Sequence, residues 1–140
     1  MNNVYLVGDT HGYPIEIKNK DALLIHLGDA EDTEIIGECR TKILIRGNHD
    51  EETIGKCFNE TFDLIVDSLV MYDVFFTHEP AERLPKGCCL NIHGHLHDLS
   101  YSDYGYEQKP FHIRLIPHEL SVLGDIKKSI TKELSFNRVR

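Results

Sequence analysis

The sequence contains no tryptophan, only two methionines and no apolar run long enough to cross a bilayer. Its longest uncharged apolar stretches are a few residues, as in Ala22-Leu23-Leu24-Ile25. The chain also starts without the basic region and apolar region that make a secretory signal peptide. These absences lead us to expect a protein without a membrane span, located in the cytoplasm.

Cysteine motifs are missing as well. The four cysteines, Cys39, Cys57, Cys88 and Cys89, form no C-x-x-C pair, so a structural zinc site is not expected. The adjacent residues Cys88 and Cys89 would need strained geometry to bridge each other. Reduced, mostly buried thiols are therefore the expected state, as is usual in the cytosol.

Positive charge is in short supply, because 15 Lys and Arg against 23 Asp and Glu give a formal net charge of −8. A protein that binds long nucleic acids neutralises their phosphates with Lys and Arg, so a polynucleotide track is not expected. Bound metal ions can still create a local positive site for a single phosphate. The length of 140 residues, 41% of them hydrophobic, predicts one globular domain over residues 1–140.

Short apolar runs alternate with polar segments along the chain. Runs that are short and mostly continuous in apolar residues are typical of strands buried on both faces. Seven runs fit this description: Val4–Val7, Ala22–Leu27, Ile43–Ile45, Leu64–Val66, Val74–Thr77, Cys89–Ile92 and Phe111–Ile116.

Helices are expected between and after these runs. Thr33–Arg40 and Glu51–Cys57 would be short helices, and Tyr13–Asp21 has room for a minimal one. Ser121–Leu134 places its apolar residues on one face, with Ser121 as the N-cap. Early alternation of strands and helices predicts an α/β fold with a partly parallel sheet, and the later strands predict hairpins and mixed pairing.

Five polar clusters each follow an apolar run. They are Asp9-Thr10-His11, Gly28-Asp29-Ala30-Glu31-Asp32, Gly47-Asn48-His49-Asp50, Thr77-His78 and Gly94-His95-Leu96-His97. Functional residues in α/β folds gather at the carboxyl ends of strands, so neighbouring strands would bring these side chains to one edge. The mixture of carboxylates, a carboxamide and imidazoles suits Mn, Fe, Zn, Co or Ni better than calcium. Glycines at 8, 28, 47 and 94 predict tight turns that expose the ligands.

This set of clusters, in this order, resembles the calcineurin-like metallophosphoesterases from about Val4 to His97. The resemblance implies a four-layer αββα sandwich with two mixed β-sheets. It also implies a small single-domain enzyme of the phosphodiesterase type with two divalent metal ions, Mn first, and Fe, Zn, Ni or Co as alternatives. The activity that follows is hydrolysis of phosphodiester bonds, or of phosphomonoester bonds as a second option, by a hydroxide that bridges the two ions.

The resemblance also assigns residues to the two ions. One ion would be held by Asp9, His11, Asp29 and His97. The other would be held by Asp29, Asn48, His78 and His95. Asp29 would thus bridge the two ions, and the two histidines of the last cluster would serve different ions.

Further residues are expected around the substrate. His49 would stay off the metals and protonate the leaving oxygen as general acid, oriented by Asp32. Arg46 could contact a substrate phosphate beside Asn48 and His49, but a structural ion pair is nearly as good an interpretation. Asp50 is interpreted as a cap of the next helix, with support of His49 as the alternative.

The other histidines are expected to be mainly structural. His26 lies inside an apolar run and should be a hydrogen-bonded core residue. His112 and His118 are interpreted as structural or surface residues, while His93 could also support the site or the substrate. Ser100–Pro110 is expected to be a loop or hairpin tip, and its tyrosines could line a substrate rim or a dimer contact.

Three rival functions stay open. A nuclease acting on short oligonucleotides would use the same metal core. A protein phosphatase is a weaker alternative, because Thr33 and Glu34 follow Asp32 where that branch of the family has an Arg-Gly pair. A non-catalytic scaffold, such as a subunit of the retromer coat, represents another class of function. The expected partner is a small phosphate ester or nucleotide, with no long nucleic acid and no membrane.

Overall fold

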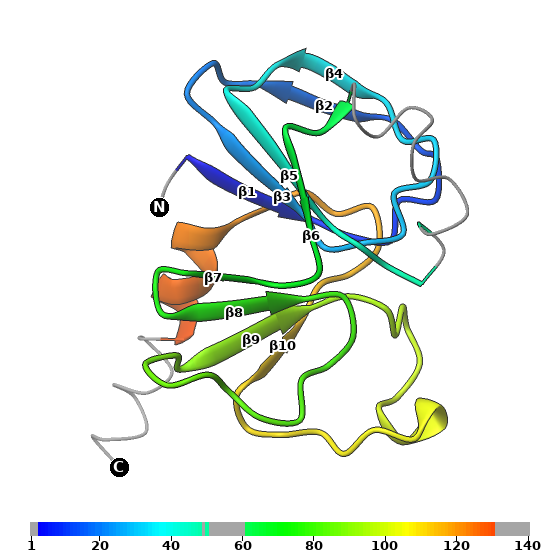
Figure 1. Ribbon diagram of the computed structural model, residues 1–140, viewed down its shortest axis with the longest axis vertical. Coiled ribbons are helices and arrows are strands. Elements are labelled where there is room, and N and C mark those ends of the chain that lie inside the picture. Colours follow the sequence, from blue (N-terminus) through cyan, green and yellow to red (C-terminus); the bar gives the residue numbers. More distant parts are fainter. Residues whose placement is uncertain (1–2, 49, 51–60, 131–140) are drawn as a thin grey trace.

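The structure, a computed structural model, describes residues 3–48, 50 and 61–130. Short connections join its strands (Figure 1). The strands are β1 (Val4–Val7), β2 (Ile15–Lys18), β3 (Leu23–His26), β4 (Ile35–Glu38), β5 (Thr41–Ile45), β6 (Leu64–Val66), β7 (Leu69–Met71), β8 (Val74–Thr77), β9 (Leu90–His93), β10 (His112–Arg114) and β11 (Ser121–Val122). Each of the seven predicted strand runs overlaps an observed strand, so these predictions are confirmed.

The strands form three sheets that lie above one another in Figure 1. The middle sheet has the order β11-β1-β3-β5-β6, and the lower sheet has the order β10-β9-β8-β7. The small upper sheet consists of β2 and β4. Pairing is parallel throughout except for β11 with β1 and β7 with β8, so both larger sheets are mixed.

From β1 to β5 the chain coils between the small sheet and the middle sheet. Successive strands alternate between the two sheets, and each strand lies parallel to the strand two places earlier. The register pairs Val4 with Leu23 and Leu23 with Thr41, so each turn of the coil adds a strand directly beside the previous one. We read this architecture as a β-solenoid.

The predicted α/β class and the four-layer αββα sandwich are therefore wrong. The structure is mostly strands and is 11% helical, which leaves no helical layer on the outside of the described sheets. Where the minimal helix at Tyr13–Asp21 was expected, the chain forms β2. Where the helix at Thr33–Arg40 was expected, it forms β4.

Local sequence explains why these two segments are strands. Ile15, Glu16, Ile17 and Lys18 alternate between buried and exposed, the period of two that a half-buried strand requires. In the second segment Gly37 has a φ of +96°, and a Cβ there would lie 2.1 Å from the carbonyl oxygen of Ile17. The close approach of the two strands therefore depends on a glycine, a residue that also weakens a helix.

Two apolar cores separate the sheets. The larger core contains Leu6, Ile25, Phe76 and Ile92, all fully buried between the middle and lower sheets. A smaller core around Val7, Ile17 and Leu24 lies between the middle sheet and the small sheet. The small sheet thus covers the face of the middle sheet that a helical layer was expected to cover.

The predicted helix at Ser121–Leu134 is shorter at its start. Residues 123–130 are helical, whereas Ser121 and Val122 form β11, so Ser121 is not the N-cap. Leu123, Ile126 and Ile130 contact the larger core, as the apolar face predicted. Residues 131–134 and the predicted helix Glu51–Cys57 lie outside the described residues. Ser100–Pro110 is a loop that contains a short 3-10 helix, η2 (Ser102–Tyr104).

The structure bears on two predictions, one about the cysteines and one about membrane spans. Cys39, Cys88 and Cys89 are free thiols, as predicted, but Cys39 and Cys88 are only half-buried and Cys89 is exposed, so the predicted burial is wrong for these three. Cys57 lies outside the described residues. Over the described ranges, the structure contains no helix with the length and apolarity that a membrane span requires.

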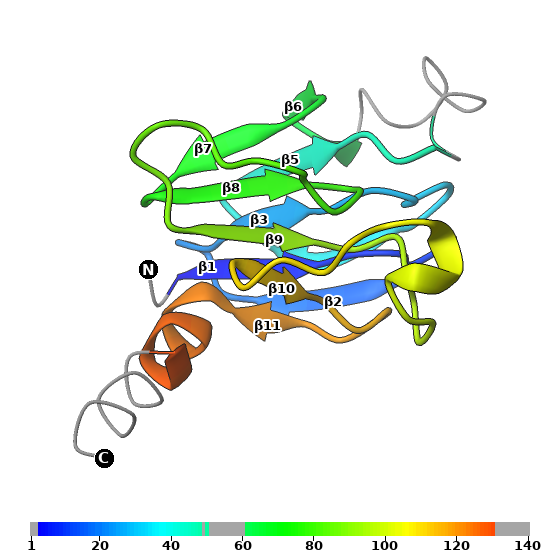
Figure 2. The same cartoon turned by 90° about the horizontal axis from the view of Figure 1, so that it is seen from below.

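The carboxyl ends of five strands meet at one edge of the molecule. The parallel strands β1, β3 and β5 of the middle sheet and β8 and β9 of the lower sheet all end on the same side (Figure 2). The helix at residues 123–130 lies at the opposite end. The loops at the carboxyl ends carry the five polar clusters, so the sheets position the candidate site.

Candidate metal centre

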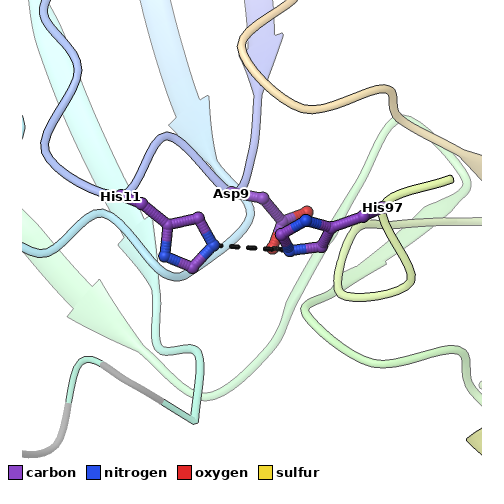
Figure 3. A group of neighbouring side chains, drawn as sticks. All are labelled: Asp9, His11 and His97. Atoms are coloured by element: carbon purple, nitrogen blue, oxygen red, sulfur yellow. Dashed lines mark hydrogen bonds and ion pairs between the residues drawn. The ribbon is translucent and has the colours of Figure 1, made fainter.

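The first group of side chains consists of Asp9, His11 and His97, which we call cluster 1 (Figure 3). Each offers one ligand atom, and these atoms lie within 4.8 Å of one another. The Nε2 atoms of His11 and His97 face each other at 3.3 Å, although the residues are 86 positions apart. Asp9 is fully buried, and its Oδ1 lies 3.8 Å from Nε2 of His97.

The second group, Asp29, His78 and His95, forms cluster 2. Nε2 of His78 lies 3.2 Å from Oδ2 of Asp29 and 3.2 Å from Nδ1 of His95. It is also 2.9 Å from Oδ1 of Asn48. Three oxygen or nitrogen atoms therefore converge on a single ring nitrogen.

Asp9 links the two clusters. Its Oδ2 accepts a hydrogen bond from the backbone N–H of His95, at 2.9 Å. Its Oδ1 is 4.0 Å from Nδ1 of His78 and has no hydrogen-bond partner among the described residues, despite its burial. A buried carboxylate oxygen without a donor carries a desolvation cost, which a bound cation would offset.

Backbone contacts hold the two ligand loops together. The N–H of Asp9 donates to the carbonyl of Gly28, and the N–H of His11 donates to the carbonyl of Asp29, each at 2.9 Å. These two hydrogen bonds hold the loop after β1 against the loop after β3. The loops after β8 and β9 are joined in the same way, by Gly94 N–H and the carbonyl of His78.

The ligand loops have unusual backbone geometry. Asp9, His11, Asp29, His95 and His97 all have positive φ, between 47° and 72°. This left-handed region is costly for residues other than glycine, by about 1–3 kcal/mol each when the backbone is strained. The backbone conformation that brings these side chains together therefore has a cost in conformational free energy.

Two glycines leave space for the carboxylates of Asp29 and Asp9. A Cβ on Gly47 would lie 2.2 Å from Oδ1 of Asp29, and a Cβ on Gly94 would lie 2.6 Å from Oδ2 of Asp9. Neither glycine has a positive φ, so close approach, and not turn conformation, is what requires them. The sequence prediction located these glycines but attributed them to tight turns.

Protonation of the clusters reflects their burial and their crowding. Burial raises the pKa of Asp9, although His78 and His97 act against it. Burial alone would lower the pKa of His78, but the hydrogen bond and charge of Asp29 outweigh it and raise that pKa. Burial, followed by the charge of His78, lowers the pKa of His95. The raised pKa values of Asp9 and His78 favour bound protons beside the carboxylates, and a metal ion would compete with these protons.

Hydrogen bonds fix the ring orientation of two histidines. Nδ1 of His78 contacts the carbonyl oxygen of Leu27 at 2.8 Å, so this nitrogen is the donor and Nε2 faces Asp29. Nδ1 of His11 contacts Oε1 of Glu31 at 3.0 Å, so its Nε2 faces His97. Metal-binding histidines commonly donate their other N–H to a carbonyl or carboxylate in this way. Sequence reasoning gave Glu31 no role.

Asp50 is a second functional residue whose role the sequence did not reveal. Its Oδ2 accepts the N–H groups of Asp29 and Gly47, both at 2.8 Å. Its Oδ1 accepts those of Ala30 and Glu31, at 2.9 and 3.1 Å. Asp50 therefore clamps the loop after β3 to the loop after β5. The alternatives considered from sequence, a cap of the next helix or support of His49, both involve residues outside the described ones.

A buried hydrogen-bond chain lies behind the loop of Asp9 and His11. The N–H of Gly28 donates to Nδ1 of His26 at 3.1 Å, which leaves Nε2–H of His26 to donate to Oγ1 of Thr10 at 2.7 Å. Thr10 then contacts the hydroxyl of Thr33. Burial lowers the pKa of His26 to about 3, so the ring is neutral. The prediction that His26 is a hydrogen-bonded core residue is confirmed.

A second buried assembly lies behind the loop of His95 and His97. Nε2 of His93 is 2.7 Å from the hydroxyl of Tyr101, and the Tyr101 ring stacks on His112 at 5.2 Å. The guanidinium of Arg114 lies 4.7 Å from the centre of the same ring and donates to the carbonyl of Leu99. His93 thus supports the loop that carries two proposed ligands.

The predicted substrate residues have different outcomes. Arg46 forms an ion pair with Asp67, with Nε donating to Oδ1 at 2.9 Å, so its structural alternative is present. Asn48 joins cluster 2 through His78. Asp32 is exposed, and His49 lies outside the described residues, so the general acid and its orienting partner stay predictions. Asp29 falls in cluster 2 by distance, and its bridging role likewise stays a prediction.

A hollow of about 500 Å³ opens beside cluster 2. Its wall includes Asn48 and His78 from the cluster, together with Arg46, Asp67 and Glu79. A side chain or ligand in this hollow would therefore reach both the candidate metal ligands and a guanidinium.

Comparison of the chain with family models, curated proteins and solved structures finds no match in any of the three. The likeness to metallophosphoesterases consequently rests on the motifs and on the side-chain groups that they form.

Proposed function

We propose that this protein is a metal-dependent phosphoesterase that hydrolyses phosphodiester bonds, with phosphomonoesters as the second substrate class. The proposal rests on the order of the motifs and on the geometry of the two clusters, and it does not depend on the αββα fold. Two divalent ions would occupy clusters 1 and 2, with Mn²⁺ as the first candidate among Mn, Fe, Zn, Ni and Co.

The observation that carries the proposal is the environment of His78. Its Nδ1–H is already used by the carbonyl of Leu27, while its Nε2 faces oxygen atoms of Asp29 and Asn48 and a nitrogen of His95. A single proton on Nε2 cannot satisfy three such partners. A divalent ion bound at their centre would be coordinated by all of these groups, a mixed N/O set that suits transition metals.

Cluster 1 fits a second ion for a related reason. Two Nε2 atoms face each other at 3.3 Å, and only one of them can donate a proton to the other. The buried Oδ1 of Asp9 is close by and has no donor among the described residues. Two imidazoles and a carboxylate are a donor set typical of Mn, Fe or Zn sites.

The two ions would supply Lewis acidity, which lowers the pKa of water and offsets charge on phosphate oxygens. The chain itself provides the arrangement. Leu27 and Glu31 orient the rings of His78 and His11, and Asp50 fixes the loop of Asp29. Arg46 lines the hollow, and its guanidinium, which is paired with Asp67, lies beside the space for a phosphate oxygen.

Hydrolysis adds one water oxygen to phosphorus and breaks the bond to the ester oxygen. The departing oxygen then needs one proton. His49, oriented by Asp32, is the proposed donor, because an imidazole titrates near neutral pH. A cytoplasmic location completes the proposal, since the free thiols of Cys39, Cys88 and Cys89 suit a reducing compartment.

The test compares hydrolysis of bis-p-nitrophenyl phosphate and p-nitrophenyl phosphate by protein stripped of metal and then given Mn²⁺. Activity should appear with metal and disappear with chelator, and the diester should react faster. Full activity of the metal-free protein would contradict the proposal. Bound metal without turnover of either ester would favour the scaffold alternative.

A further inference from the structure

Two tyrosines lie against cluster 2. The ring centre of Tyr104 is 5.1 Å from that of His95, and the ring centre of Tyr106 is 6.1 Å from it. Tyr104 is 46% exposed, so much of its ring remains accessible. Burial, with the charge of Glu79 and a hydrogen bond to it, raises the pKa of Tyr106. The loop of residues 100–110, the yellow segment in Figure 1, therefore carries two rings that lie against His95 of cluster 2.

Space for a ligand group exists beside Tyr106. A second hollow of about 460 Å³ has Tyr106 in its wall. It shares Pro80 and Ala81 with the hollow next to cluster 2, so the two spaces adjoin at these residues. A group attached to a phosphate at cluster 2 would have room in either hollow.

Ala81 and the tyrosine loop are held in place by buried groups. The N–H of Ala81 donates to Oδ1 of Asn91 at 2.9 Å, and Nε2–H of His112 donates to the carbonyl of Ala81 at 2.7 Å. On the loop, Tyr101 is buried, and its carbonyl accepts the N–H of Tyr106 at 2.9 Å. The rings of Tyr104 and Tyr106 are thus presented by an anchored backbone, so little ordering is needed when a ligand binds.

The charges around the hollows limit the number of phosphates. Asp67 and Glu79 line the first hollow, and Arg46, its cation, is already paired with Asp67. In the second hollow, Lys109 pairs with Glu107 at 3.0 Å. A chain of further phosphates would meet carboxylates without a spare cation among these lining groups, whereas an uncharged planar group would not.

We propose that the substrate is a nucleoside ester with a single phosphate, whose planar base stacks on Tyr104 and Tyr106 while the phosphate lies at the clusters. This inference rests on the proposed function and specifies its substrate class. Stacking on aromatic rings tolerates any base, because every base has a π-face. Long nucleic acids and polyphosphates are excluded by the charge of the hollows.

The test uses two diesters that release the same p-nitrophenolate and differ only in the group that stays on phosphorus. Thymidine 5′-p-nitrophenyl phosphate carries a base, and methyl p-nitrophenyl phosphate does not. The Mn²⁺-loaded protein should show a higher kcat/KM for the thymidine ester. In Tyr104→Ala the ratio of the two kcat/KM values should fall about fivefold or more, the loss expected for one stacking contact.

Two matched variants serve as controls. Tyr104→Phe keeps the ring and should keep the ratio. Tyr72→Ala removes a tyrosine that is 49% exposed in the turn between β7 and β8, at the other end of β8, and should also keep it. Equal kcat/KM values for the two esters in the unaltered protein would overturn the inference, as would an unchanged ratio in Tyr104→Ala.

A binding measurement separates this inference from the proposed function. If neither diester is turned over, phosphodiester hydrolysis fails, and isothermal titration of the Mn²⁺-loaded protein with AMP and ribose 5-phosphate decides the inference. AMP should bind about fivefold more tightly or better, and Tyr104→Ala should remove the difference. Equal affinities for the two compounds would overturn the stacking site even in an active enzyme.

Discussion

The histidines of the two clusters differ in burial. The side chains of Asp29 and His78 in cluster 2 are 2% and 4% exposed, whereas those of His11 and His97 in cluster 1 are 26% and 41% exposed. A buried site excludes water and competing ligands, while an open one exchanges them. We therefore expect the ion in cluster 2 to be held more tightly, and the ion in cluster 1 to be the exchangeable one.

Supporting contacts differ in the same direction. Cluster 2 is fixed by a backbone carbonyl behind His78 and by the Asp50 clamp behind Asp29. Cluster 1 depends on Glu31, whose side chain is 36% exposed, and on the hydrogen-bond chain through Thr10. Both groups could therefore hold a cation, and the histidines of cluster 1 are the more exposed.

The largest effect should come from Asp29→Asn, which removes the charge that cluster 2 is built around. Loss of a partner behind a metal ligand already costs roughly 10–100-fold, so loss of the ligand charge should lower phosphoesterase activity by more than about 100-fold. The measurement is ester hydrolysis with Mn²⁺, alongside metal content. Glu31→Gln is the counterpart at cluster 1 and should weaken only the exchangeable ion. A near-normal rate in Asp29→Asn would remove Asp29 from the mechanism.

Breaking the clamp should affect stability next. Asp50→Ala removes the acceptor of four backbone N–H groups and should lower the free energy of unfolding by about 3 kcal/mol or more, because buried donors are left without partners. Urea unfolding measures this. Asp67→Ala is the control, since its carboxylate is 81% exposed and its pair with Arg46 should contribute less than about 1 kcal/mol. Similar losses in both variants would contradict the clamp.

The pH dependence of stability should distinguish His78 of cluster 2 from His26, which lies behind cluster 1, in metal-free protein. His78 has a raised pKa, so its contribution is complete below the unfolded value of 6.5 and is lost as pH rises through the folded pKa. His26 has a pKa lowered to about 3, so its contribution is present above 6.5 and is lost as pH falls toward 3. Each group changes the free energy of unfolding by up to about 1.4 kcal/mol per pH unit.

Urea unfolding from pH 4 to 8.5 in chelator measures these slopes. His78→Gln should flatten the decline on the alkaline side, and His26→Gln should flatten the decline on the acid side. Identical pH profiles of unfolding free energy for the two variants would contradict the assignment of His78 to the alkaline decline and of His26 to the acid decline.

The smallest effect is expected behind cluster 1. Thr33→Val keeps the shape of the side chain but removes the hydroxyl that contacts Thr10 and donates to the carbonyl of Ala30. The expected loss is about 1 kcal/mol of unfolding free energy, with weaker binding of the exchangeable ion and little change at cluster 2. Calorimetric titration with Mn²⁺ would check this, and equal weakening of both ions would contradict the separation of the clusters.

Much of the candidate site followed from the sequence, because ligand types at strand ends are local features. The pattern after each apolar run was sufficient to select Asp9, His11, Asp29, His78, His95 and His97, which the structure brings together in two groups. The parallel pairing of β1 with β3 and of β8 with β9 then brings these residues together, because it places the carboxyl ends of the paired strands side by side.

The layers could not be predicted in the same way. Four-residue segments such as Ile15–Lys18 are too short for periodicity to be decisive, and a family likeness in the motifs suggested helices there. Ile35 and Ile36 are β-branched, a local preference that favours the strand observed there. The roles of Asp50 and Glu31 depend on contacts between loops, which no local pattern contains.

The positive φ values of Asp9, His11, Asp29, His95 and His97 carry a consequence for evolution and engineering. Replacing any one of them by glycine would relieve its backbone strain, while the same change would delete a candidate ligand. Selection for thermal stability alone would therefore remove candidate metal ligands at these positions. A screen that rewards only heat resistance should collect glycine and asparagine here, and so map the site without any assay of its chemistry.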